Sequence, residues 1–254
     1  MSNALIFAAG LGTRLKPMTD TMPKALVPIG GKPLLQIQLE KLINAGVTDI
    51  VVNVHHFARQ VIDFVYHSDF SASLSGVNIQ ISDETDCLLE TGGGLKKAAR
   101  LFSNKAPILV HNVDILSNVD LQKFSERAYN DMQQPTTLIV SERPTQRYLL
   151  ADENSRLVGW TNIATGEVKT PYAGLDVESC RKVAYSGIQL FNPALLPLMD
   201  SWSGKFSIID FYLSICNKQE IRLECREGLS LLDVGKLDSI ARAESFLAEN
   251  IPLI

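Results

Sequence analysis

Short apolar segments alternate with longer amphipathic ones over the first 140 residues, and this alternation limits the fold more than any other feature of the chain. The apolar segments predict strands at residues 4–8, 49–54, 78–82, 106–111 and 136–141. The amphipathic segments predict helices from Pro33 to about Gly46 and at residues 57–66, 95–101 and 121–131. Strands that alternate with helices are typical of βαβ units. We therefore expect an α/β fold with a Rossmann-like, mixed but mainly parallel sheet and helices on both faces.

After about residue 142 the chain contains shorter, more polar stretches. Residues 151–166, which are rich in Thr, Asn and Gly, predict hairpins over the rim of the sheet. Further helices are expected at residues 193–202, 208–216 and 237–249, with strands at 221–225 and 231–234. A chain of 254 residues with 46% hydrophobic content can bury one large core. We expect a single domain with two halves, residues 1–141 and 142–254.

Charge and cysteine content exclude several classes of protein. A formal net charge of -4 and a pI near 5.6 argue against a nucleic-acid surface, which needs clustered Lys and Arg. The cysteines are scattered without a Cys-x-x-Cys pair, so neither a zinc site nor a redox motif is predicted. The N-terminal segment lacks the basic region of a signal peptide, and no apolar run reaches the roughly 18 residues that a bilayer requires. We expect a soluble, cytoplasmic protein with reduced thiols that binds neither nucleic acid nor a membrane.

A glycine turn and two cations follow the first predicted strand. Gly10 and Gly12 lack a Cβ, so the main chain can approach an anion closely there. Arg14 and Lys24 then supply positive charge. A dinucleotide-binding fingerprint would need a third glycine where Leu15 stands, and Gly10 does not lead into the Gly-Lys-Ser/Thr of a Walker A loop. The order of residues indicates a strand that delivers a backbone cradle and positive charge to a triphosphate.

The same stretch resembles the signature of the sugar nucleotidyltransferases, which reads Gly-x-Gly-Thr/Ser-Arg and then Pro-Lys. The matching residues are Gly10, Gly12, Thr13, Arg14, Pro23 and Lys24. The resemblance implies the nucleotide-diphospho-sugar transferase fold. It also implies that the nucleotide is bound by Ala8, Ala9, Gly10, Gly12, Thr13, Arg14 and Lys24. No hexapeptide repeat is present, so the β-helix that some members append is not expected.

Two aspartates are candidates for a metal site. Asp114 follows the predicted strand at 106–111, where a carboxylate can hold a divalent ion or simply turn the chain. In the resembled family a Gly-Asp pair at this position holds the catalytic Mg²⁺, and Val113 replaces that glycine here. Asp233 begins an Asp-Val-Gly sequence similar to the family's closing motif, whose aspartate completes the site. The resemblance thus implies Mg²⁺ held by Asp114 and Asp233.

Residues 90–94, Glu-Thr-Gly-Gly-Gly, form a second glycine cluster before the predicted helix at 95–101. Their bare backbone can bind an anion at the helix N-terminus or lie against a base. By resemblance they form the base-recognition loop, which implies nucleotide contacts from Glu90, Thr91, Gly92 and Gly93. This form of the cluster is most similar to uridylyltransferases that act on N-acetylmuramic acid 1-phosphate.

Candidate sugar contacts lie near the same edge and in the second half of the chain. Tyr185, Ser186 and Gly187 precede a predicted strand, as a Ser/Thr-Gly-Ile segment does in the resembled family, and Asn112 lies near Asp114 in sequence. Many relatives carry Glu-Lys-Pro after the first hairpin, with the lysine on the sugar phosphate, whereas this chain reads Thr-Asn-Ile-Ala. The open candidates to replace that lysine are Arg143, Arg147 and Lys169.

The resemblance implies nucleotidyl transfer from an NTP to a sugar 1-phosphate, giving an NDP-sugar and pyrophosphate. A phosphate monoester is largely dianionic near pH 7, so the attack needs no general base. The residues expected to act in catalysis are Arg14, Lys24 and Asp114. UTP and N-acetylmuramic acid 1-phosphate are the favoured substrates. The alternatives are mannose 1-phosphate with GTP, glucose 1-phosphate with UTP or dTTP, and a regulatory subunit that binds NTP without turnover.

Overall fold

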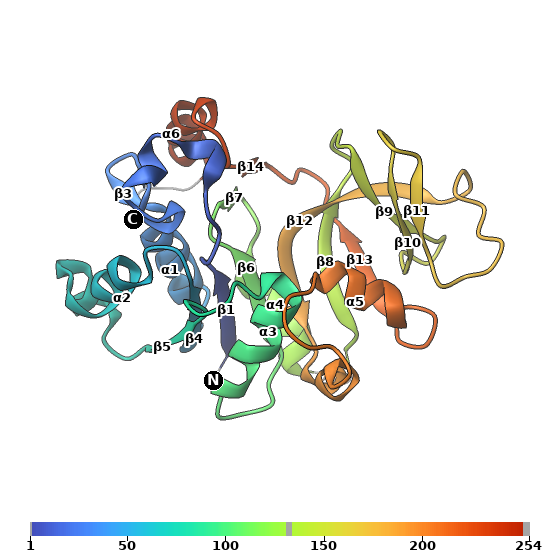
Figure 1. Cartoon of the computed structure of the whole chain (residues 1–254), viewed down its shortest axis with the longest axis horizontal. Coiled ribbons are helices and arrows are strands. Elements are labelled where there is room, and N and C mark those ends of the chain that lie inside the picture. Colours follow the sequence, from blue (N-terminus) through green and yellow to red (C-terminus); the bar gives the residue numbers. More distant parts are fainter. Residues whose placement is uncertain (1, 131–133, 251–254) are drawn as a thin grey trace.

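The computed structural model describes residues 2–130 and 134–250, and its centre is a ten-stranded mixed sheet (Figure 1). The strand order is β11-β10-β9-β12-β6-β1-β4-β5, with β8 paired to β12 and β13 paired to β8. The strands of this sheet are β1 (Asn3–Phe7), β4 (Asp49–Val54), β5 (Asn78–Asp83), β6 (Ile108–Asn112), β8 (Thr136–Ser141), β9 (Arg147–Ala151), β10 (Leu157–Asn162), β11 (Glu167–Lys169), β12 (Arg181–Phe191) and β13 (Ile221–Cys225).

Strands β1, β4, β5 and β6 are parallel. β1 lies between β4 and β6, with Leu5 opposite Val51 on one side and Val110 on the other. β5 extends the parallel set beside β4. Ala4, Leu5 and Ile6 are all fully buried, because helices cover both faces, and this explains why the strand is a continuous apolar run. The predicted α/β fold with a mixed sheet is confirmed.

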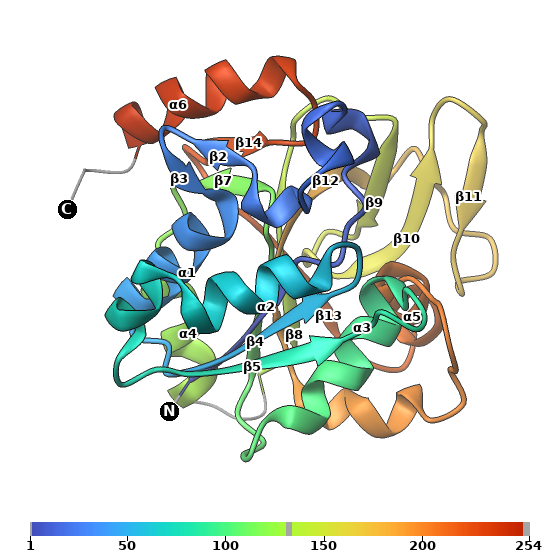
Figure 2. The ribbon, with the colours of Figure 1, turned by 60° about the vertical axis from the view of Figure 1, so that its left-hand side comes forward.

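Helices cover the two faces in separate groups (Figure 2). Apolar residues of α1 (Leu34–Asn44), α2 (Ala58–His67), α4 (Leu121–Asn130) and α6 (Asp238–Asn250) pack in one core with Ala4 and Ile6. Those of α3 (Glu90–Ala98), α5 (Ile208–Ile215) and the 3₁₀ helix η6 (Pro193–Met199) pack in a second core with Leu5. The other 3₁₀ helices are η1 (Thr13–Leu15), η2 (Met18–Asp20), η3 (Lys24–Leu26), η4 (Asp69–Leu74) and η5 (Ala99–Leu101). No helix in the described ranges is long and apolar enough to span a bilayer.

One long strand joins the two halves of the molecule. β12 is antiparallel to β6, β8 and β9, and the antiparallel run β9-β10-β11 continues the sheet beyond it as the predicted hairpins. Two small sheets lie apart from the main one. They are β2 (Pro28–Ile29) with β3 (Lys32–Pro33), and β7 (Ile115–Ser117) with β14 (Leu231–Asp233).

Three predicted elements differ from the structure. The helix expected at 193–202 is the shorter 3₁₀ helix η6, which contains Pro197, a residue without the N–H that an α-helix needs. The segment Tyr185 to Ile188, expected to precede a strand, lies inside β12. The helix expected at 95–101 begins at Glu90 and includes the glycine cluster. The helix expected to end at Asp131 is α4, and Asp131 itself lies outside the described residues.

Candidate active site

The loop after β1 presents bare backbone to a cavity. Ala8 and Ala9 donate their N–H groups to Asn53 Oδ1 at 2.7 and 3.2 Å, which ties the end of β1 to β4. A Cβ built on Gly10 would meet no heavy atom within 4 Å. Gly10 lines the cavity, and it does so without a positive φ. Its lack of a side chain leaves open space for a ligand.

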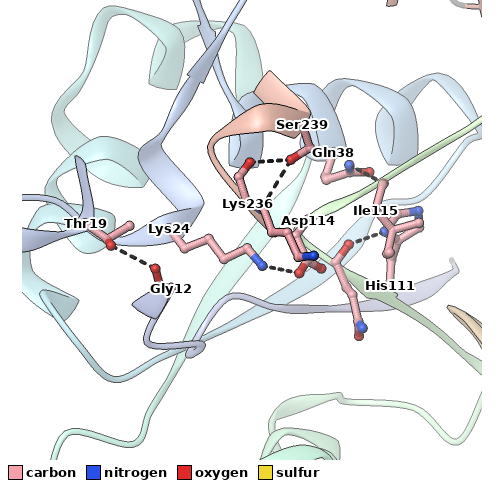
Figure 3. Close-up of polar contacts among 10 residues, drawn as sticks. Gly12, Thr19, Lys24, Gln38, His111, Asp114, Ile115, Lys236 and Ser239 are labelled. Atoms are coloured by element: carbon pink, nitrogen blue, oxygen red, sulfur yellow. Dashed lines mark hydrogen bonds and ion pairs between the residues drawn. The ribbon is translucent and has the colours of Figure 1, made fainter. Parts of the chain in front are cut away.

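Gly12 is required for a different reason. Its φ of +64° lies in the left-handed region, and a Cβ there would come within 2.9 Å of Thr19 Cγ2 and 3.0 Å of Lys24 Cβ. The hydroxyl of Thr19 donates to the Gly12 carbonyl at 2.8 Å (Figure 3). The chain therefore folds back on Gly12 and brings Lys24 beside the start of the loop. Thr13, by contrast, is exposed in η1 and lines neither cavity described below.

Lys24 and Asp114 are in direct contact. The Lys24 side chain is only 10% exposed, and its ammonium forms a hydrogen-bonded ion pair with Asp114 Oδ2 (Figure 3). Asp114 follows β6, as predicted, and therefore lies at the carboxyl edge of the parallel strands. Val113 fits before it because its side chain is buried in the core and its backbone does not have a positive φ. This turn does not need the glycine that the resembled family carries.

The second aspartate, Asp233, is held near Asp114 by the small sheet of β7 and β14. β14 is antiparallel to β7 and sets Asp233 opposite Ile115, the residue after Asp114. The Val234 N–H donates to the Asp114 carbonyl at 2.8 Å. Burial raises the pKa of Asp233, and the nearby negative charge of Asp114 raises it further. The two predicted metal ligands are thus brought together.

Arg14 lies beside Asp233. A Cβ on Gly235 would be 2.8 Å from Arg14 Nη2 and 2.7 Å from Asp233 Oδ1. Lys24, Arg14 and Arg143 oppose the upward shift in the pKa of Asp233, so all three cations act on that carboxyl. Arg14, Lys24 and Asp114, the residues predicted to act in catalysis, therefore lie around Asp233.

The first cavity, of ≈ 320 Å³, opens at the carboxyl ends of β1, β4, β5 and β6. Ligands of open α/β sheets bind at this edge. The predicted residues that line it are Ala9, Gly10, Lys24, Glu90, Thr91, Asn112 and Asp114. Phe7, Leu88 and Val113 give it apolar walls.

Asn53 and Glu84 form a network that the sequence motifs did not indicate. Asn53 Nδ2 donates to Glu84 Oε1 at 2.8 Å, and Glu84 Oε2 accepts from the Leu89 N–H at 3.0 Å. Glu84 is 1% exposed, and both side chains line the first cavity. The network fixes the glycine loop relative to the start of α3. The signal for it was a polar residue within or just after an otherwise apolar strand.

The second glycine cluster is helical. A Cβ on Gly92 would lie 2.3 Å from the Phe206 ring, and one on Gly93 would lie 2.4 Å from the Gly204 carbonyl. The Gly92 N–H donates to the Phe206 carbonyl at 2.9 Å. The expected loop is therefore the first part of α3, and its glycines let the helix pack against residues 204–206. Gly92 and Gly93 do not line the first cavity.

Glu90 and Thr91 do face the cavity from the start of α3. Glu90 has a φ of +57°, a conformation that is costly for a residue with a Cβ and that is found at functional sites. Its carboxylate pairs with Lys205 Nζ at 3.3 Å. The Thr91 hydroxyl accepts the N–H of Ile208 at 3.0 Å and so joins α3 to the start of α5.

A second cavity, of ≈ 520 Å³, lies between the β9-β10-β11 strands and the start of α5. Its lining includes Tyr185 and the three candidates for the missing lysine, Arg143, Arg147 and Lys169. Ser207 lines both cavities. The Ser207 hydroxyl accepts the N–H of Ile209 at 3.2 Å and caps α5.

The other predicted sugar contacts are divided between the cavities and the core. Asn112 lines the first cavity, and a Cβ on Gly187 would be 2.8 Å from Asn112 Nδ2. Gly187 has a φ of +80° at an irregularity of β12. Ser186 is buried, and its hydroxyl accepts the Ile188 N–H at 3.2 Å. Burial raises the pKa of Tyr185.

Comparison with known proteins gives the class of the molecule. Residues 3–250 match the model of the nucleotidyl transferase family. An N-acetylmuramate α-1-phosphate uridylyltransferase of Caulobacter vibrioides is 32% identical over 252 residues, which cover 97% of each chain. A mannose-1-phosphate guanyltransferase of Kluyveromyces lactis is 30% identical over 200 residues, 77% of this chain and 51% of that one.

A solved structure of UDP-glucose pyrophosphorylase in complex with UDP-glucose superposes with a TM-score of 0.76. The match covers 98% of this chain and 99% of that one at 16% identity, so it supports the fold. The chain belongs to the nucleotidyl transferase family. Within that family it is an enzyme of the sugar-1-phosphate nucleotidyltransferase type.

Proposed function

We propose that this enzyme transfers the uridylyl group of UTP to N-acetylmuramic acid 1-phosphate, forming UDP-N-acetylmuramic acid and pyrophosphate. The observation that carries the proposal is the junction of two cavities at Ser207, with Lys24 and Asp114 in one and three cations in the other. The relative from C. vibrioides supports this choice of base and sugar because it aligns over 97% of both chains.

The reaction is an in-line displacement at the α-phosphorus. A non-bridging oxygen of the sugar phosphate forms a bond to that phosphorus, and the bond to the β-phosphate oxygen breaks. The leaving pyrophosphate keeps the electron pair, and no proton has to move because the attacking phosphate is largely dianionic near pH 7. The protein must therefore position the reactants and stabilise developing negative charge.

The residues of this chain have matching roles in that scheme. Gly10 leaves room for the phosphates against its backbone. Lys24 is held by Asp114, and Arg14 lies beside Asp233, so both cations are in place before the substrates bind. Preorganised charge of this kind lowers the barrier because it needs no rearrangement during the reaction.

Asp114 and Asp233 would hold Mg²⁺. The fit rests on the donor set, because β14 sets Asp233 opposite Ile115 and the Val234 N–H bonds the Asp114 carbonyl, which brings two carboxylates together. Burial and the negative charge of Asp114 raise the pKa of Asp233, and a bound cation would oppose that shift. The described residues contain no group of three or more His, Cys, Asp or Glu side chains that could hold a metal. Mg²⁺ is commonly bound by one or two carboxylates together with substrate phosphates and water. When bound, it would neutralise charge on the phosphates.

The test is a matrix of three nucleotides and three acceptors, with pyrophosphate release as the readout. UTP, GTP and dTTP are each combined with the 1-phosphates of N-acetylmuramic acid, mannose and glucose in the presence of Mg²⁺. We expect UTP with N-acetylmuramic acid 1-phosphate to exceed every other pair by about tenfold or more in kcat/KM, the order of discrimination that one good pocket provides.

Two results would contradict the proposal in different ways. A maximum with GTP and mannose 1-phosphate would make the chain a guanylyltransferase. NTP binding without pyrophosphate release from any acceptor would make it a regulatory subunit. The Asp233→Asn variant is the control, since it should abolish release for every pair if the measured turnover arises at this site.

A further inference from the structure

We propose that Arg147 binds a carboxylate on the sugar and thereby selects an acidic sugar 1-phosphate. This inference rests on the proposed function and goes further, because it assigns a specificity-determining residue and the group that it reads.

Arg147 belongs to a continuous wall of the second cavity. It is the first residue of β9 and lies opposite Asn162 on β10. Along the same pair of strands Leu149 lies opposite Trp160, which in turn lies opposite Lys169 on β11. These side chains share one face because residues two apart on a strand point to the same side, and all of them line the cavity.

The cavity carries excess positive charge in an acidic protein. Its lining holds Arg143, Arg147 and Lys169 against two carboxylates, Glu167 and Asp210. The chain as a whole has a formal net charge of -4. A local excess of this sign favours an anionic ligand and disfavours a cationic one.

Two of the three cations already have other partners. Lys169 Nζ pairs with Asp210 at 3.0 Å and with Glu167 at 3.9 Å, and lies 5.3 Å from the centre of the Trp160 ring. Arg143 donates to the Tyr185 carbonyl at 2.9 Å. The described part of the chain provides no ion pair or hydrogen bond for the guanidinium of Arg147, whose backbone N–H alone is bonded, to Thr145 Oγ1.

Arg143 and Arg147 place their positive charges at different ends of the second cavity. Arg143 is held on the carbonyl of Tyr185 in β12, and a Cβ on Gly187, two residues further along, would be 2.8 Å from Asn112 Nδ2 of the first cavity. Arg143 therefore lies toward the first cavity, where the sugar phosphate must meet the nucleotide. Arg147 begins β9 and lies opposite Asn162 of β10, on the side of β12 away from β6 in the strand order. The cavity therefore offers one cation to the phosphate and a separate, unpaired guanidinium to another anion.

The chemistry of the proposed substrate supplies that anion. N-acetylmuramic acid carries a lactyl ether with a carboxylate, a group that N-acetylglucosamine, mannose and glucose lack. A guanidinium binds a carboxylate through two parallel hydrogen bonds, and a lysine in its place would keep the charge without this geometry. Arg147 matches the one functional group that distinguishes the acidic sugar from its neutral counterpart.

The test compares two acceptors that differ only in the lactyl group, N-acetylmuramic acid 1-phosphate and N-acetylglucosamine 1-phosphate, with UTP in both reactions. We expect Arg147→Gln to lower kcat/KM for the acidic sugar by about 30-fold, which is the usual effect of losing a charge-assisted hydrogen bond. The value for the neutral sugar should change by less than about threefold. Arg147→Lys should fall between Arg147→Gln and the wild type.

Arg156→Gln is the matched control, because Arg156 precedes β10 and lines neither cavity. The Arg156→Gln variant should leave kcat/KM unchanged for both acceptors. Equal losses for both acceptors in Arg147→Gln would overturn the inference while the proposed function stands. A wild type that uses the neutral sugar as well as the acidic one would also overturn it.

Calorimetric titration of the two sugar phosphates without UTP separates the inference from the proposed function. If turnover fails with every acceptor, the proposed function is wrong. Wild-type protein that still binds the acidic sugar more tightly than the neutral one, with the preference lost in Arg147→Gln, would then support the carboxylate site. Equal binding of the two sugars would refute it.

Discussion

Each aspartate of the site is accompanied by a cation from the glycine loop or from the segment after it. Lys24 contacts Asp114, and Arg14 lies next to Asp233 across Gly235. The pairing positions the cations before any substrate is present. In the Lys24–Asp114 pair, whose side chains are only 10% and 20% exposed, removing one member also leaves a largely buried charge without its counterpart, which is costly.

Arg14→Ala should therefore lower kcat by about 10²- to 10³-fold, the loss typical of one preorganised electrostatic group. Stability should change little, since Arg14 is exposed. Lys16→Ala is the control, because Lys16 is an exposed cation two residues away that pairs with Asp20 at 3.0 Å. Pyrophosphate release measures the activity of both variants. Equal activities in Arg14→Ala and Lys16→Ala would contradict the role of Arg14.

His111 is a buried histidine near this site. It is fully buried, and its Nδ1 lies 2.8 Å from the Asn112 carbonyl oxygen. Nε2 has no hydrogen-bond partner among the described residues. Burial lowers the pKa of His111 to about 3, and the charge of Lys41 contributes to the shift. His111 is therefore neutral in the folded protein at every pH near neutrality.

Stability should fall as the pH drops from about 6.5 toward 3, because the unfolded chain binds a proton on His111 that the folded protein does not. From pH 7 to pH 5 this residue should account for a loss of roughly 2 kcal/mol in the free energy of unfolding. Urea unfolding at the two pH values measures it. The loss should disappear in His111→Gln and persist in His67→Gln, since the His67 side chain is 66% exposed. The same loss in all three proteins would assign it elsewhere.

At the scale of elements, helix α3 helps to fix the position of the site. Its glycines allow close packing against residues 204–206, and its first residues, Glu90 and Thr91, reach the first cavity. On the other side of the sheet, Gln38 Nε2 of α1 donates to the Ile115 carbonyl at 2.8 Å (Figure 3). This bond holds β7, and β7 pairs with the strand that carries Asp233. Helices on both faces therefore fix the edge where the aspartates meet.

The variants Gly92→Ala and Gly10→Ala should distinguish a glycine that packing requires from a glycine that ligand binding requires. The new Cβ in Gly92→Ala would overlap the Phe206 ring, so we expect the free energy of unfolding to fall by about 1–3 kcal/mol, as overpacking usually costs. The new Cβ in Gly10→Ala meets nothing and points into space that the ligand needs. Gly10→Ala should keep its stability and lose affinity for UTP. Thermal unfolding and UTP titration check the two effects, and the reverse pattern would refute this division.

At the scale of the molecule, β12 makes the two halves one structural unit. It pairs with β6 in the first half and with β9 in the second. Ile188 and Leu190 of this strand belong to one core, and Val183 and Phe191 belong to the other. The two expected halves, residues 1–141 and 142–254, are joined by this strand. The pairing of the sheet therefore does not divide the chain into separate domains.

The chain should consequently unfold in one cooperative step. Trp160 and Trp202 both lie in the second half, so their fluorescence reports that half, while far-ultraviolet circular dichroism reports the whole chain. We expect the two urea transitions to coincide, which is the usual test for two-state unfolding. A fluorescence transition at lower urea than the dichroism transition would show that the second half unfolds independently.

The sheet could be predicted from the sequence, and so could the grouping of Arg14, Lys24, Asp114 and Asp233 at one edge, because both leave local signals. Strands buried on two faces appear as apolar runs, and the glycine loop has fixed spacing. The resemblance predicted a loop at residues 92–94, and the low helix propensity of glycine agrees with that, but packing against Phe206 makes these residues helical. Asn53 and Glu84 were missed because a network between separate strands leaves no spacing in one segment. The choice among Arg143, Arg147 and Lys169 depended on partners that only the folded chain brings together.

The sharing of Ser207 by the two cavities has a kinetic consequence. In the proposed function each substrate occupies one cavity, whereas the nucleotide sugar would join the contents of both in a single molecule. A ligand held at two linked sites dissociates more slowly than either half alone, because one end can rebind while the other is free. Departure of the nucleotide sugar should therefore limit turnover, and accumulated product should inhibit the enzyme in competition with both substrates.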